Sequence, residues 1–376
     1  HKEDAMTLEV TESACLPAAN LPTPALHTEI SSAAQPARAP TDPLRRQSKA
    51  GAIGLSALAS AALAACGGGD NTDVSTLAGK PAPPPAAGSS QAISAEQAAR
   101  FLHQAQFSSS DAEIEQVRAQ GYVGWLSAQM AQPPTQSGWD WLISRGYNSA
   151  ASNILDNEAY TDFMVWYQLM QASDAMRKRV ALALSEIMVV SASSVEGESC
   201  SFAMAAYWDV LNRNAFGNYR KLLGEITLNP AMGSFLNTLG NQKEDAATGR
   251  QPDENYAREV MQLFTIGLYQ LNADGTLRLG ANGRPIETYG QSDVTNLARV
   301  FTGYVLDPTG HVKGVKPERY RNPMMVKANQ HSTLGATFLG VTIAGSTPPQ
   351  QKLDMALDAL FNHANTAPFI AHQLIQ

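Results

Sequence analysis

The sequence predicts a mainly α-helical protein: an irregular, orthogonal bundle of many helices with one small β-hairpin near residues 276–289. Three observations favour this fold class. Capping residues precede several apolar segments, as at helix starts. Apolar side chains in those segments recur every three or four residues, which is the helical period. Turn signals at 272–275 and 281–283, reading NADG and ANG, lie just before and within the segment that we expect to be a hairpin.

The helix starts are the clearest local signals. Ser94 with Gln97, and Ser110 with Glu113, have the spacing of a capping box. Gly121 should end the second helix, and Asp174 should cap a long helix in the middle of the chain. In chain order, we expect helices over residues 96–105, 111–119, 122–130, 159–172, 174–190, 202–212, 219–227, 229–239, 252–269, 291–304, 352–363 and 367–376. The chain stops inside the last of these helices, so we expect it to be truncated at the C-terminus.

Several aromatic residues lie at helical spacing in the first half of the chain. They are Trp139, Trp141, Tyr147, Trp166 and Tyr167. Such residues are compatible with a carbohydrate platform, but helical spacing favours the core. We therefore expect them to be buried.

The first 92 residues have the composition of an exported lipoprotein. Residues 1–43 are rich in Ala, Pro, Thr and Ser, which predicts a disordered leader. Residues 44–66 follow the basic, apolar, small order of an export signal, and their LAAC ending resembles a bacterial lipobox. Residues 67–92 form a Gly- and Pro-rich tether. We therefore expect Cys66 to be acylated and residues 93–376 to form one helical domain, incomplete at its C-terminus, outside the cytoplasm in the periplasm or at the cell surface.

Charge and motifs exclude several kinds of function. The 376-residue chain has a formal charge of -7, and no basic stripe is visible, which argues against a nucleic-acid partner. HExxH, paired CxxC, G-x-S-x-G and glycine-rich phosphate loops are absent from the sequence. No cofactor is indicated. The sequence is compatible with a divalent metal bound at Glu259.

Several motifs together resemble the bacterial family called domain of unknown function 1800. They are RFL at 100–102, AQF at 105–107, GNYRKLL at 217–223, NPAM at 229–232, PDENYARE at 252–259, ARVFTGY at 298–304, and His331 with LG at 339–340. The resemblance covers residues 94–376 and implies a mostly helical, exported protein without an agreed activity. Two positions depart from the family pattern: Asp253 stands in place of Asn, and Ser332 follows His331 in place of Asp.

The segment 252–259 is the candidate site. It places Glu254, Asn255 and Glu259 near the start of an apolar helix, where polar groups are costly to bury without partners. One interpretation is structural: Glu254 pairs with Arg258, and a polar network ties this helix to Arg299 and to the loop after Gly240. The other is functional: Glu254, Asn255, Glu259 and His331 line a cleft, with Glu259 as general base or metal ligand.

Two functions follow from these interpretations. The first is a lipid-anchored envelope protein without catalytic activity, which binds an envelope protein or polymer and takes part in surface assembly. The alternative is a hydrolase that acts on an extracellular polymer or ester at the Glu/Asn/His site.

Overall fold

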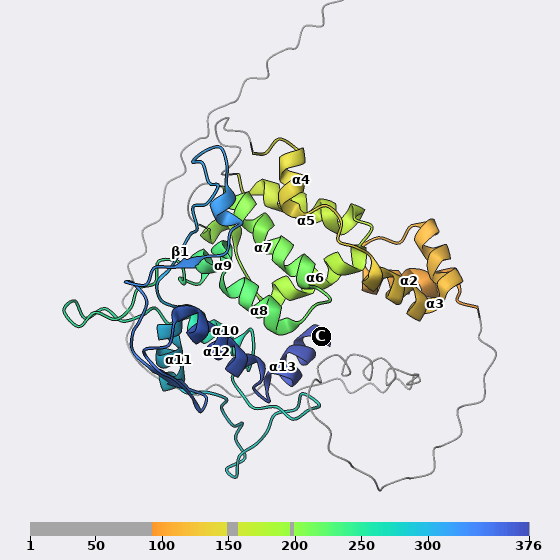
Figure 1. Ribbon diagram of the computed structural model, residues 1–376. Coiled ribbons are helices and arrows are strands. Elements are labelled where there is room, and N and C mark those ends of the chain that lie inside the picture. Colours follow the sequence, from red (N-terminus) through yellow and green to blue (C-terminus); the bar gives the residue numbers. More distant parts are fainter. Residues whose placement is uncertain (1–91, 149–156, 196–198, 376) are drawn as a thin grey trace, which may run out of the picture. The chain divides into compact units, whose positions relative to one another are not determined.

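The computed structural model describes residues 92–148, 157–195 and 199–375. These residues form mainly helices and two small antiparallel sheets, so the predicted fold class is confirmed (Figure 1). All of them belong to one compact unit, Pro85–Gln376. The predicted leader and export signal, Cys66 included, and almost all of the tether lie outside the described residues.

Most predicted helices are present close to their predicted positions. The α-helices are α2 (Ala95–Ala105), α3 (Asp111–Ala131), α4 (Gly138–Ser144), α5 (Ala159–Gln171), α6 (Ala175–Ile187), α7 (Cys200–Asn214), α8 (Tyr219–Thr227), α9 (Pro230–Phe235), α10 (Asn255–Gln262), α11 (Gln291–Ala298), α12 (Pro349–Phe361) and α13 (Thr366–Ile375). Short 3-10 helices are η1 (Ala192–Ser194), η2 (Arg299–Phe301) and η3 (Glu318–Tyr320). Both capping boxes, at Ser94 and Ser110, are formed. Gly121 interrupts α3 with a left-handed φ of 71°, as its sequence position predicts.

The helix α7 is buried along almost its whole length. It contacts α4, α5, α6, α8 and α9, and Figure 1 shows it beside α6 in the middle of the described helices. A helix enclosed in this way must be apolar or must pair its polar groups internally. Asn212 and Asn214 do the latter: their Nδ2 groups donate to the carbonyl oxygens of Trp208 (2.8 Å) and Val210 (2.9 Å).

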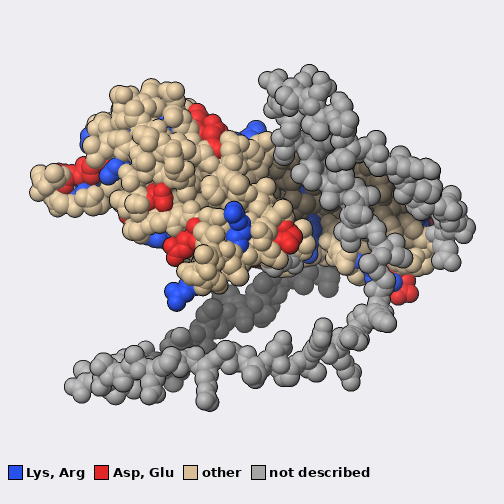
Figure 2. Space-filling view, turned by 90° about the horizontal axis from the view of Figure 1, so that it is seen from below, with Lys and Arg blue, Asp and Glu red and all other residues tan. Residues whose placement is uncertain are grey.

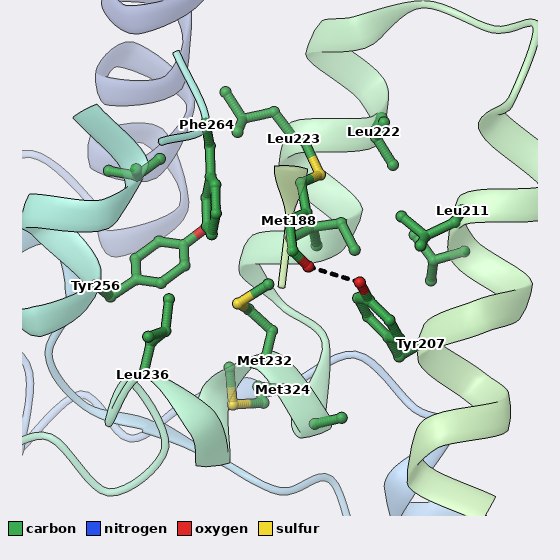
Figure 3. Close-up of a cluster of buried hydrophobic side chains, with 14 of the residues drawn as sticks. Met188, Tyr207, Leu211, Leu222, Leu223, Met232, Leu236, Tyr256, Phe264 and Met324 are labelled. Carbon is green, nitrogen blue, oxygen red and sulfur yellow. Dashed lines mark hydrogen bonds between the residues drawn. The ribbon is translucent and has the colours of Figure 1, made fainter. Parts of the chain in front are cut away.

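The main core lies where α7, α8, α9 and the α10 region meet (Figure 3). Its drawn side chains include Leu211, Leu223, Met232 and Phe264, all fully or almost fully buried. Tyr207 enters this core with its hydroxyl donating to the carbonyl oxygen of Met188 at 2.6 Å. Because the polar end of the ring is satisfied, its burial costs little.

A second, smaller cluster joins α2 to α3. It contains Ala98, Leu102, Val117 and Trp125, all buried. The ring of Phe101 stands edge-on to Trp125, with ring centroids 5.3 Å apart, a favourable aromatic geometry.

The helix α10 ends at Gln262 rather than at residue 269 as predicted. Gly267 has a left-handed φ of 66°, and the N–H groups of Ile266 and Gly267 both donate to the carbonyl oxygen of Met261 at 2.9 Å. Asn365, which lies between α12 and α13, then holds the new direction of the chain. Its Nδ2 donates to the carbonyl oxygens of Ile266 (2.5 Å) and Tyr269 (2.9 Å). These contacts come from the other end of the sequence, so a local pattern could not predict them.

The predicted hairpin near 276–289 is present with one isolated antiparallel bridge, Leu279 with Pro285, and two further bridges join Leu277 to Leu271 and Glu287 to Tyr269. Pro285 has no N–H group, so the ladder of backbone hydrogen bonds does not extend into a regular strand at this position. The regular strands lie later in the chain. β1 (Tyr304–Val305) pairs with β2 (Met325–Val326), and β3 (Ala336–Phe338) pairs with β4 (Val341–Ile343). Leu339 and Gly340 between β3 and β4 both have positive φ, as a tight two-residue turn requires.

Charges are spread thinly over the surface. On the face shown in Figure 2, acidic and basic side chains are interspersed and neither sign forms one large patch. Among the described helices, none combines the length and the apolar character needed to cross a bilayer.

Candidate functional site

Asn241 ties the start of α10 to a distant part of the fold. Its Oδ1 accepts the N–H of Asp253 at 2.9 Å, and its Nδ2 donates to the carbonyl oxygens of Asp253 and Phe301, both at 3.2 Å. The expected link to the loop after Gly240 therefore exists. The expected link to Arg299 is wrong, because that guanidinium donates to the carbonyl oxygen of Gly335 at 2.8 Å instead.

Glu254 joins α10 to α11. Its Oε2 accepts from Arg258 (3.3 Å), as predicted, and from Gln291 Nε2 (2.7 Å). Its Oε1 accepts the hydroxyl of Thr295 at 2.7 Å. Both oxygens are thus occupied by structural partners. The Glu254–Arg258 pair is partly exposed to solvent, so it stabilises the fold by less than about 1 kcal/mol.

Glu259 differs from Glu254 because one of its oxygens has no partner. Its Oε2 is buried and makes no hydrogen bond in the described structure. Burial raises the pKa of Glu259, and the nearby charge of Arg258 opposes that effect. Asn255 uses its backbone N–H, which donates to Asp253 Oδ1 at 2.8 Å, and no side-chain bond from Asn255 to Glu259 occurs among the described residues. The unpartnered oxygen and the raised pKa of Glu259 suit a group that accepts a proton, but the side chain of Asn255 does not orient it.

His331 is almost completely buried beside the strand β1. Its Nδ1 lies 2.8 Å from the carbonyl oxygen of Thr302, so Nδ1 carries the proton. Its Nε2 is buried without a hydrogen-bond partner, and burial lowers the pKa of the imidazole, which favours the neutral form. Gly303 permits this approach, because a Cβ there would lie 2.8 Å from the backbone nitrogen of His331. Within the described structure no hydrogen bond joins His331 to Glu259, so their shared cleft stays a prediction.

Ser332 has contacts that sequence reasoning did not find. Its hydroxyl donates to both carboxylate oxygens of Glu244 at 2.9 Å, and its N–H donates to the hydroxyl of Thr302 at 2.8 Å. Its carbonyl oxygen accepts from the buried ammonium of Lys352 at 2.7 Å. Burial lowers the pKa of Lys352. Ser332 is fully buried, so these contacts anchor the His331 segment rather than present a nucleophile to solvent.

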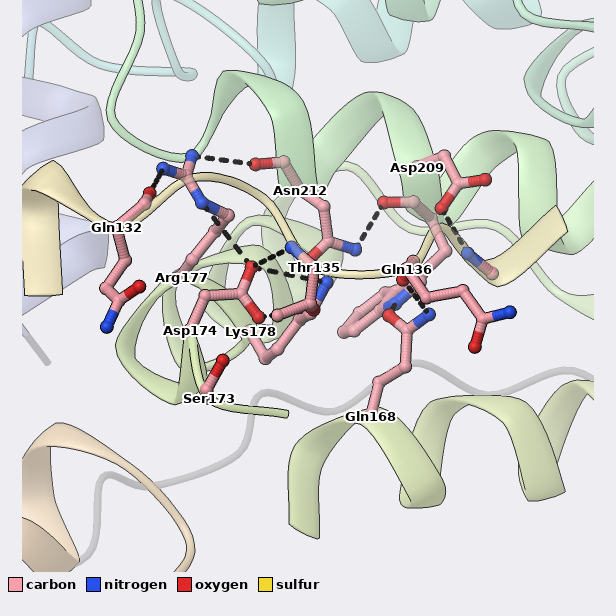
Figure 4. A network of polar contacts seen from close by, with 12 residues as sticks. Gln132, Thr135, Gln136, Gln168, Ser173, Asp174, Arg177, Lys178, Asp209 and Asn212 are labelled. Carbon is pink, nitrogen blue, oxygen red and sulfur yellow. Dashed lines mark hydrogen bonds and ion pairs between the residues drawn. The ribbon is translucent and has the colours of Figure 1, made fainter. Parts of the chain in front are cut away.

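A second polar network lies between α6 and α7, and sequence reasoning missed it (Figure 4). Asp174 is predicted to cap α6, but its side chain makes no cap bond. It accepts instead from the N–H (3.2 Å) and hydroxyl (2.6 Å) of Thr135, and it forms 3.6 Å ion pairs with Arg177 and Lys178. All three charged side chains are buried. Such a network is costly to break, because each removed partner leaves a buried charge.

Asp209 extends this network from α7 to the first turn of α4. Its two oxygens accept the N–H groups of Gly138 (2.6 Å) and Trp139 (3.1 Å). Burial raises the pKa of Asp209 to about 6, although these two bonds and the charge of Lys178 oppose the effect. Burial also lowers the pKa of Lys178. Lys178 and Asp209 both line one cavity, and titratable groups with shifted pKa values cluster at functional sites.

Metal ligands do not gather in the part of the chain that the structure describes. No group of three His, Cys, Asp or Glu side chains there could hold an ion.

The five aromatic residues that we expected to be buried differ in their exposure. Trp139 and Trp141 are buried, and Tyr147 is partly buried. Trp166 and Tyr167 are exposed, so their predicted burial is wrong.

Comparison with known proteins gives one finding. Residues 100–376 match the model of a family described as "Protein of unknown function (DUF1800)". No curated protein and no solved structure matches the chain.

Proposed function

We propose that this chain, which belongs to the DUF1800 family of proteins of unknown function, is an exported, lipid-anchored envelope protein with a binding or assembly role. Its partners in this proposal are the membrane, reached through the lipid on Cys66, and an envelope protein or polymer. It acts in the periplasm or at the cell surface and binds no nucleic acid.

The lipid anchor is supported by the order of residues 44–66. Two arginines precede a run of small apolar residues that ends in Leu63, Ala64, Ala65 and Cys66. A single thioether-linked diacylglycerol with an amide-linked chain buries enough methylene groups for stable membrane attachment. Cells fed an alkyne fatty acid should label the wild-type protein and not Cys66→Ser. Equal labelling of the two proteins would rule out this anchor.

The binding role rests on one observation: an exposed apolar stripe on α5. The stripe consists of Phe163, Trp166, Tyr167 and Met170, which stand three or four residues apart. Between 42% and 57% of each side chain is exposed. α5 packs by the adjacent face, which carries the fully buried Met164. Large apolar side chains gathered on one helix face mark an interaction surface more often than a solvated one.

A photo-crosslinking amino acid introduced at Trp166 tests this role in living cells. We expect discrete crosslinked species that disappear when Phe163 and Met170 are both changed to Ser. Leu279 is the matched control position, because it is equally exposed, at 59%, but lies in the turn region far from α5 in the sequence. The same crosslinked species from Leu279, or none from Trp166, would contradict the proposal.

The alternative, a hydrolase, is favoured by two unpartnered buried atoms, Glu259 Oε2 and His331 Nε2. An oxygen and a nitrogen of this kind are the groups that general acid-base catalysis uses. A screen of ester and polysaccharide substrates should then show turnover that Glu259→Gln abolishes. Activity that survives in Glu259→Gln would remove this carboxylate from the mechanism, and the absence of turnover in the wild type would leave the binding role alone.

A further inference from the structure

A cavity of about 160 Å³ lies beside the network of Figure 4, where α7 faces the segment before α4. On this measure about 10–15 Å³ suffices to hold one water molecule, so the cavity has room for a small ligand. Its polar lining residues include Thr135, Lys178, Asp209, Asn212, Arg213 and Arg321. Of its three cations, Lys178 is paired with Asp174 and Arg213 with Glu225, so Arg321 is the cation that remains for an anion.

Asn212 brings an unsatisfied acceptor to this cavity. The side chain is only 4% exposed, and its Nδ2 is committed to the carbonyl oxygen of Trp208. Its Oδ1 is buried and has no hydrogen-bond partner in the described part of the chain. A buried amide oxygen normally has a partner, so this one is suited to a donor that a ligand supplies.

Lys178 brings a buried ammonium group. It is 1% exposed, and its Nζ stands 3.6 Å from Asp174 Oδ2, which is longer than a hydrogen bond. Asp209, the acid of the lining, already accepts the N–H groups of Gly138 and Trp139. The negative charge of Asp209 is therefore offset by the first turn of α4, and Lys178, which is paired with Asp174, keeps the interior of the cavity from carrying a net negative charge.

Arg321 supplies the third group. Its side chain is exposed, and its guanidinium lies 5.4 Å from the ring centroid of Trp139. It makes no ion pair or side-chain hydrogen bond within the described structure, unlike Arg213, which pairs with Glu225 at 2.9 Å. Arg321 and Arg213 also line a neighbouring cavity of about 320 Å³. An arginine held by an aromatic ring, with its fork of N–H donors unused, is suited to a planar carboxylate.

We propose that this cavity binds a small carboxylate that also carries hydroxyl groups, as the uronic acids of envelope polysaccharides do. Arg321 binds the carboxylate, and Asn212 Oδ1 accepts a ligand hydroxyl. The inference adds a second, polar site to the binding role proposed above, separate from the apolar stripe on α5. It does not depend on the lipid anchor, so a failed titration leaves the Cys66 labelling result unaffected.

Isothermal titration calorimetry of the full chain with D-glucuronate tests the site. We expect saturable binding, and binding at least about 10-fold weaker for glucose, which lacks the charge, and for acetate, which lacks the hydroxyl groups. Arg321→Gln should weaken glucuronate binding at least about 10-fold, whereas Arg284→Gln should not change it. Arg284 is the matched control because it is also exposed, in the turn before α11.

Three results would overturn the proposal. They are no saturable binding of glucuronate, equal binding of glucose or acetate, and unchanged binding in Arg321→Gln. Both variants alter exposed side chains, and matching circular dichroism spectra will show that both are folded. A result in either direction is therefore informative.

Discussion

Replacement of Asp209 by Asn should change how the stability of the protein depends on pH. Asp209 accepts two backbone N–H groups at the start of α4, and burial raises its pKa to about 6 from an ordinary value of 3.8. The folded protein therefore keeps the proton of Asp209 to a higher pH than the unfolded chain does. The stabilising effect of this proton is fully present below pH 3.8 and is lost as the pH rises through about 6.

The size of the effect follows from the shift in pKa. A shift of about two units corresponds to about 3 kcal/mol when the carboxyl group is fully ionised. Between pH 4.5 and 7.5, the linkage relation gives a change of about 2 kcal/mol. Asp209→Asn does not titrate, and its lost hydrogen bond costs about the same at every pH. The variant should therefore gain about 2 kcal/mol relative to the wild type over this range.

Urea unfolding followed by circular dichroism, at intervals between pH 4.5 and 7.5, measures this difference. Asn218→Ala is the matched control, because Asn218 accepts the N–H of Lys221 at 3.2 Å but carries no charge. It should lose about 1 kcal/mol at every pH. If the difference between wild type and Asp209→Asn stays constant across the range, the carboxyl group is not buried as described.

Three further substitutions test the packing by urea unfolding at pH 7. Asn365→Ala should lose about 2–4 kcal/mol, because it leaves buried carbonyl groups of the turn after α10 unpaired; a loss under 1 kcal/mol would show that the turn holds without it. Leu223→Ala should lose about 2–5 kcal/mol through the cavity that it leaves in the main core, and a smaller loss would mean that the core collapses to fill it. Glu254→Ala should lose about 1–2 kcal/mol, because it removes the exposed pair with Arg258 and the hydrogen bonds from Gln291 and Thr295, and unchanged stability would show that these contacts do not tie α10 to α11.

The sequence predicts those elements whose causes are local. The capping boxes at Ser94 and Ser110 use residues three apart, and Gly121 needs only its own backbone freedom to break α3. The early end of α10 depends on Asn365, which lies about a hundred residues away, so no local pattern contains it. The buried face of α5 depends on which neighbour it packs against, and periodicity alone does not choose between adjacent apolar faces.

The candidate site was predictable in part. The Glu254–Arg258 pair follows from their spacing, whereas the partners of Ser332 come from separate loops and helices. The burial of Lys178 and Lys352 could have been predicted from the sequence. Lys178 precedes Ala181 by three residues, and Lys352 precedes Ala356 by four, and both alanines are fully buried. A lysine on the apolar face of a helix predicts a buried charge with an acidic or carbonyl partner nearby.

The intact mass of the protein, taken from the membrane fraction of cells that express the full chain, tests the proposed function most directly. We predict a polypeptide that begins at Cys66 and carries the added mass of a diacylglyceryl group and an amide-linked fatty chain. A protein that retains the residues before Cys66, carries no fatty chains and fractionates with soluble proteins would contradict the account.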